Sequence, residues 1–193
     1  FYLYAIASHL TEKPLAVPEH RMIIDENDAL WASEFLEIAD DPMTPILEEL
    51  DLGDQWAGYP VTDGFWQLMK QFARFILSEL VVGRRLTGYT HFWGVASINP
   101  TPNARQRYTK PLLLLTNALD FSGGDFFPAI LQDNERVTIL GVRTAGAGGA
   151  VKVFPLPNQF GINEISATWT LAQRANGQPI DLPHFRASRL DTE

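Results

Sequence analysis

The sequence of 193 residues contains no cysteine, and this absence excludes several kinds of chemistry. Disulfides, thiolate metal sites and a cysteine nucleophile all require the missing residue type. Basic residues are also few, because 15 Lys and Arg stand against 23 Asp and Glu, for a formal net charge of -8. Nucleic acid and anionic membrane surfaces attract cationic proteins. We therefore expect no nucleic acid partner.

Long apolar runs are missing as well. The longest, such as residues 111–115, are far too short to cross a bilayer, so we predict no membrane span. Four histidines are widely separated and none has metal-ligand spacing, so we predict no metal and no other cofactor. Each is predicted to be a structural or surface residue: His9, His20, His91 and His184.

Hydrophobic residues make up 46% of the sequence, enough for a well-packed core. Thr62 and Asp63 precede an apolar stripe at helical spacing, which predicts a helix over 63–76. Short apolar runs predict buried strands over 112–115 and 137–142. Alternation of apolar and polar residues predicts one strand over 165–171, and a further strand is predicted within 15–24. Helices that alternate with buried strands indicate the α/β class.

The most informative unit is a predicted strand, a turn and a helix around Ser122. A serine at the start of a helix lies where free N–H groups converge and favour negative charge. The N–H of Gly123, next in sequence, could then donate to an oxyanion. A second interpretation stays open at this point: Ser122 and Asp125 also fit the S-x-x-D pattern of an ordinary helix cap.

Two runs of sequence, 120–136 and 141–149, resemble the C-terminal processing (tail-specific) peptidase family. The resemblance is good over residues 1–24 and 108–180 and loose over 25–107. It implies an α/β fold, the C-terminal part of a crotonase/ClpP-like spiral peptidase domain with a mixed β-sheet and flanking helices. Residues 25–107 would be a helical or loop insertion and residues 108–180 the nucleophile-bearing core. It also implies a serine endopeptidase with Ser122 as nucleophile and Gly123 in the oxyanion hole.

The family resemblance also bears on the catalytic base. Most members use a Ser–Lys dyad, but Ala147 stands at the matching position and Lys152, farther on, is not assigned the role. The resemblance therefore implies the Ser–His–Glu style, with the His in an N-terminal part that precedes this chain. Asp181 stands in the slot of the orienting carboxylate. Either Asp replaces Glu there, or a short stretch with the Glu is absent between Ile180 and Asp181.

The expected partners are polypeptide substrates and an N-terminal fragment of the same protease, without which the chain should be inactive. A homodimer is left open, and the family implies a secreted or extracytoplasmic location and a role as a virulence factor. Two alternatives remain: a catalytically inactive fragment that acts as a binding partner, and an acyl-CoA hydratase-like enzyme of the same fold.

Overall fold

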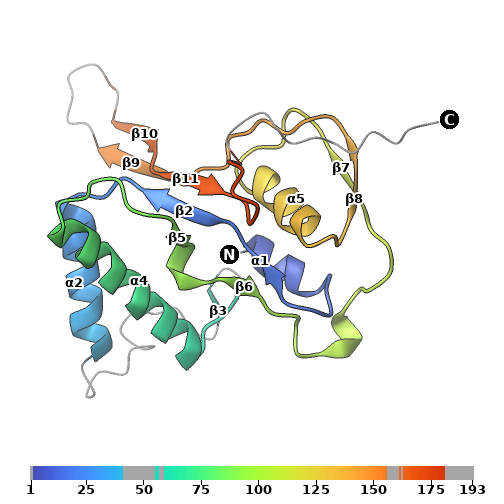
Figure 1. Cartoon of the computed structure of the whole chain (residues 1–193), viewed down its shortest axis with the longest axis horizontal. Helices are drawn as coiled ribbons and strands as arrows, with labels where there is room; N and C mark the ends of the chain where they lie inside the picture. The colour runs from blue at the N-terminus through green and yellow to red at the C-terminus, as the bar shows by residue number, and fades with distance from the viewer. Residues whose placement is uncertain (1, 41–54, 57–58, 156–160, 162, 181–193) are drawn as a thin grey trace.

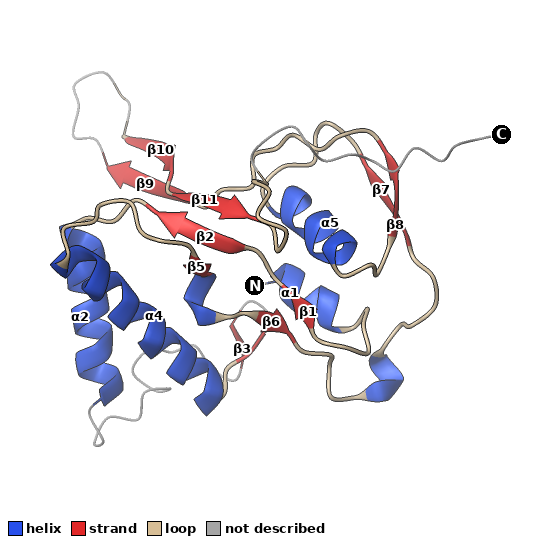
Figure 2. Cartoon of the chain, in the orientation of Figure 1, coloured by secondary structure: helices blue, strands red, loops and turns tan. Residues whose placement is uncertain are grey.

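The structure is a computed structural model that describes residues 2–40, 55–56, 59–155, 161 and 163–180 (Figures 1 and 2). The α-helices of this part are α1 (Tyr2–Ser8), α2 (Glu26–Asp40), α4 (Asp63–Val81) and α5 (Gly123–Asp133). The strands are β1 (Leu15–Ala16), β2 (Glu19–Met22), β3 (Gln55–Trp56), β4 (Tyr59–Pro60), β5 (Thr90–His91), β6 (Ser97–Ile98), β7 (Leu113–Thr116), β8 (Thr138–Gly141), β9 (Val151–Pro155), β10 (Glu164–Thr168) and β11 (Thr170–Gln173). Short 3-10 helices span Phe92–Gly94 and Ala104–Gln106.

Helix α4 forms as its sequence predicts. The Oγ1 of Thr62 accepts a hydrogen bond from the N–H of Phe65 at 3.2 Å, which caps the first turn. The apolar stripe is buried and packs against α2, with Phe72 2% exposed and Ile76 1% exposed. This core continues into α1 and α5, so the helical pair α2–α4 and the helix after Ser122 share one apolar interior.

The strands form several small sheets, and the α/β class is confirmed. β7 and β8 pair in parallel, with Leu114 opposite Ile139. β2 lies between β11 and β5, antiparallel to both. In Figure 1, α2 and α4 stand on one side of the molecule and α5 with β7 and β8 on the other, while β2 and α1 run between them.

Two predicted strands are each divided in the structure. The predicted strand within 15–24 becomes β1, paired with β6, and β2, paired with β11, because Pro18 between them lacks the N–H that a continuous ladder needs. The predicted strand over 165–171 breaks at Trp169, whose indole N–H donates to the carbonyl of Ile23 at 2.8 Å. Beyond this break the burial is the reverse of the prediction, since Thr170 is fully buried and Leu171 is 45% exposed.

The prediction that the strands over 112–115 and 137–142 are buried is wrong for one face of β7 and β8. Thr116 and Ile139 are buried, but Leu113 and Leu115 are 58% and 69% exposed and Leu140 is 36% exposed. Alternation along each strand and the parallel register place these three leucines on one face. Across the described residues, the helices are all too short or too polar to span a membrane.

Candidate active site

Ser122 occupies a strained turn between β7 and α5. Its backbone has φ 54° and ψ −114°, a conformation that L residues with a side chain rarely adopt and that costs on the order of 1–3 kcal/mol. Its side chain does not cap α5, so the ordinary helix-cap interpretation is not what the structure contains. The N–H of Ser122 instead donates to the carbonyl of Ala147 at 3.0 Å. The turn therefore holds the serine between the helix and the segment that contains Ala147.

Asp125 fixes that segment, residues 145–150, which we call the glycine loop. Its carboxylate is fully buried in the first turn of α5 and accepts hydrogen bonds from the N–H groups of Gly146 and Ala147, each at 2.9 Å. The N–H of Ala145 donates to the carbonyl of Asp120 at 2.7 Å. In a capping box the acid would reach back to the serine N–H. Here it joins the helix to the glycine loop, and the loop in turn holds Ser122.

Gly123 is the first residue of α5, where helical N–H groups have no partner within the helix. Within the described residues, no acceptor is found for its N–H. Ser122 and Gly123 both line a cavity of about 430 Å³. An N–H at this end of a helix, beside a serine and facing a cavity, can stabilise negative charge on a bound oxygen. The proposed roles of both residues stay predictions.

His20 also lines this cavity, although the sequence did not distinguish it from the other histidines. The residue is 6% exposed, and its Nδ1 lies 3.1 Å from the Oγ1 of Thr170. Burial, with a smaller contribution from the charge of His91, lowers the pKa of His20 to about 4. A residue with this pKa is neutral at pH 7 and a weak proton acceptor. Local sequence could have predicted its burial, because His20 and Met22 alternate with polar neighbours along β2, but not its place beside Ser122.

No lysine takes the place of the base among the described residues of this site. Ala147, at the position of the family's lysine, contacts Ser122 through its backbone carbonyl. The Nζ of Lys152 lies 3.0 and 3.1 Å from the two carboxylate oxygens of Asp28 and 3.4 Å from Asp25. Lys152 therefore forms ion pairs at the start of α2 and does not line the cavity.

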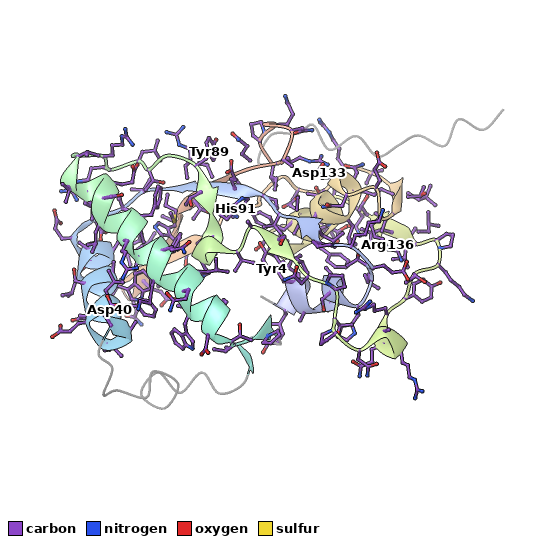
Figure 3. All side chains as sticks on the ribbon, turned by 60° about the horizontal axis from the view of Figure 1, so that its bottom comes forward. Tyr4, Asp40, Tyr89, His91, Asp133 and Arg136 are labelled. Atoms are coloured by element: carbon purple, nitrogen blue, oxygen red, sulfur yellow. The ribbon has the colours of Figure 1, made fainter. Side chains whose placement is uncertain are left out.

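The remaining candidates lie apart from Ser122 or outside the described residues. The Nδ1 of His9 lies 3.1 Å from the carbonyl of Gln106. His91, labelled in Figure 3, lies on β5 with its Nε2 3.9 Å from a carboxylate oxygen of Glu19. Asp181 and His184 fall outside the described residues. Across the part of the chain that is described, no group of three histidine or acidic side chains is placed to hold a metal ion.

Comparison with known proteins identifies the class to which this arrangement belongs. The profile of Peptidase family S41 matches residues 63–181, more than half of the chain, and the chain belongs to this family. The resemblance to C-terminal processing peptidases seen in the two motif runs is therefore confirmed.

The proteins that are similar in sequence to this chain include two from Chlamydia. A protein of Chlamydia muridarum and one of Chlamydia trachomatis serovar D are each 40% identical over 181 residues, which is 93% of this chain and 30% of the relative. Among solved structures, mature CPAF has a TM-score of 0.82 at 39% identity, covering 93% of this chain and 34% of CPAF. The complex of mature CPAF with lactacystin has a TM-score of 0.81 at the same identity and coverage. The chain thus spans about a third of the length of these relatives.

Proposed function

We propose that this chain is the nucleophile-bearing part of a serine endopeptidase that cleaves polypeptides through an acyl-enzyme on Ser122. The observation that carries the proposal is the strained backbone of Ser122 at the start of α5, beside a cavity and beside an N–H without an acceptor among the described residues. A strained strand-to-helix turn is a recurrent way to expose a nucleophilic hydroxyl. Membership of Peptidase family S41 and the likeness to CPAF support the same reaction class.

The proposed reaction follows the acyl-transfer pattern of serine peptidases. The Oγ of Ser122 attacks the scissile carbonyl carbon while a base accepts the hydroxyl proton, and the carbonyl oxygen becomes an oxyanion. The N–H of Gly123 donates to this oxyanion. The C–N bond then breaks and the amine leaves with the proton. Water attacks the resulting ester, releasing the carboxylic acid and restoring the hydroxyl of Ser122.

The base in this proposal is a histidine from a polypeptide that precedes this chain. Among the described residues His20 is the histidine that lines the cavity, but a pKa of about 4 makes it a poor proton acceptor. Ala147 supplies no titratable group at the family's lysine position. The orienting carboxylate is proposed to be Asp181, or a Glu absent from this sequence between Ile180 and Asp181.

The partner that supplies the base is proposed to be the N-terminal fragment of the same protease. The relatives are about three times as long as the matched segment, which leaves room for such a fragment. The exposed leucine face of β7 and β8 supports a packed partner layer, because apolar sheet faces are normally covered. Among the described residues β7 and β8 pair only with each other, and the outer edges of such a pair would accept further strands. We further propose a secreted or extracytoplasmic location, on the ground of the family resemblance.

A reconstitution assay tests the proposal. The chain is purified alone and with the N-terminal polypeptide, and cleavage of casein is measured in both samples, with Ser122→Ala as the matched control. We expect cleavage in the mixture and a loss of at least about a thousandfold in the chain alone, because a serine without its base keeps only the residual effects of binding and the oxyanion hole. Robust cleavage by the chain alone, or by the mixture with Ser122→Ala, would contradict the proposal. An inactive binding protein predicts no cleavage in either sample.

A further inference from the structure

Most of the side chains that line the cavity beside Ser122 are aromatic or aliphatic. Its sides come from α1, β2, the 3-10 helix Phe92–Gly94, α5 and the end of the glycine loop. Four aromatic side chains line it, and none of the described residues that line it is an acid, a lysine or an arginine: the aromatics are Tyr4, Phe92, Trp93 and Phe126. Tyr4, on α1, is labelled in Figure 3. A volume of about 430 Å³ holds a large side chain together with adjoining backbone.

His20 is held rigidly in this wall. Its ring contacts those of Phe92 and Phe126, with centroids 5.3 and 5.2 Å away, and the ring of Phe126 is stacked on it. Its Nδ1 lies 3.1 Å from the Oγ1 of Thr170. The imidazole therefore has a fixed place and one fixed hydrogen bond.

The hydrogen bonds of Thr170 determine which nitrogen of His20 carries the proton. The side chain of Thr170 is fully buried, and its Oγ1 already accepts a hydrogen bond from the N–H of Ala150 at 2.8 Å. A buried hydroxyl proton without an acceptor costs free energy, and Nδ1 of His20 is the acceptor at hand. Thr170 therefore donates to Nδ1, and the neutral ring carries its proton on Nε2. This assignment follows from the hydrogen-bond network.

We propose that this cavity receives an uncharged aromatic or large aliphatic side chain of the substrate residue whose carbonyl Ser122 attacks, and that His20 determines this specificity as a neutral wall. The proposal rests on the proposed function, since it takes Ser122 as the nucleophile. It adds the substrate class and a residue with a defined role in selecting it.

Charge selection follows from the lining. A substrate Lys or Asp side chain that entered the cavity would lose its water without gaining a charged partner, and such burial is strongly unfavourable. An apolar side chain gains the hydrophobic contribution of the aromatic walls. Discrimination by pockets of this kind amounts to about 10–200-fold for modest differences in apolar fit. We expect peptides with an apolar residue at this position to bind at least about tenfold more tightly than peptides with a charged residue there.

Binding to the complete enzyme with Ser122→Ala tests the proposal without any need for turnover. Fluorescent product-like peptides of sequence Ala-Ala-Ala-X with a free carboxylate place X in the cavity, with the carboxylate at the N–H of Gly123. X is Phe, Leu, Asp or Lys, and affinity is measured by fluorescence anisotropy. The same series is repeated with His20→Glu, and with His9→Glu as a control that changes charge equally but lies outside the cavity.

The expected result is that Phe and Leu peptides bind at least about tenfold more tightly than Asp and Lys peptides. His20→Glu should raise the affinity for Lys relative to Phe at least about tenfold, and His9→Glu should change this ratio less than about twofold. Equal binding of charged and apolar peptides to the protein with His20 intact overturns the proposal, as does an unchanged ratio in a folded His20→Glu variant. If His20→Glu does not fold, the proposal is tested by the comparison of apolar and charged peptides on the protein with His20 intact. Failure of the proposed function is seen separately, as failure of Ser122 to react with a fluorophosphonate in the protein that retains this serine.

Discussion

Replacement of Asp125 by Asn keeps the size of the side chain but should loosen its hold on the glycine loop. The fully buried carboxylate accepts the N–H groups of Gly146 and Ala147, both at 2.9 Å. Asn keeps one acceptor oxygen, but its NH2 group faces the second backbone N–H and leaves that donor unpaired. Hydrogen bonds to a charged group contribute about 1.5–3 kcal/mol, and an unsatisfied buried donor costs about 1–3 kcal/mol. We therefore expect the free energy of unfolding to fall by about 3 kcal/mol.

The same substitution should slow the chemistry, because the glycine loop holds the N–H of Ser122 through the carbonyl of Ala147. A displacement of about 1 Å at a nucleophile can cost on the order of a hundredfold in rate. Urea unfolding and the rate of fluorophosphonate reaction measure the two effects in the complete enzyme. Asp63→Asn is the matched control, since Asp63 is an exposed first-turn acid of α4 and its loss should cost only about 0.5 kcal/mol. An Asp125→Asn variant as stable and as reactive as its parent would refute this reasoning.

Three further predictions concern the glycine loop and His20. In Gly149→Ala, the new Cβ would lie 2.3 Å from the carbonyl oxygen of Thr170, so we expect urea unfolding to show a free energy of unfolding lower by about 1–3 kcal/mol. Gly123→Ala is the control: its Cβ would meet only Leu3, at 3.6 Å, so this variant should unfold nearly as its parent does. The pKa of His20 is about 4 in the folded state against an ordinary 6.5, so the unfolded chain binds more protons between these values. Stability should be full above about pH 6.5 and fall by about 3 kcal/mol as pH drops to about 4, and His20→Gln should remove this dependence in urea titrations at each pH. Ala147→Lys should not raise peptidase activity if an upstream histidine is the base, and a rise in kcat/KM would contradict that assignment.

The sequence predicted those secondary-structure elements that are determined by residues close together in the chain. The helix α4 follows from an apolar stripe and a capping Thr62, both readable in a short window of sequence. The strand–turn–helix unit around Ser122 was predicted for the same reason, and β7 and α5 flank it in the structure. The family match extends the agreement to the class of fold.

What the sequence could not predict depends on contacts between distant segments. The S-x-x-D pattern indicated a cap, but Asp125 turns its carboxylate to the glycine loop, because two backbone N–H groups are brought to it by the fold. His20 reaches the cavity through the pairing of β2 with β11, which places Thr170 at its Nδ1. The break at Trp169 likewise depends on a hydrogen bond to Ile23, far away in the sequence.

The most direct test of the central claim is the site of covalent reaction with a serine-directed fluorophosphonate. The complete enzyme is treated with the reagent, digested, and the modified peptide is identified by mass spectrometry. A hydroxyl at a strained turn, beside a free helical N–H and a positioned base, should react far faster than ordinary serines. We expect one rapidly formed adduct, on Ser122, and no adduct at that rate in Ser122→Ala. A rapid adduct on another residue, with Ser122 unmodified, would contradict it.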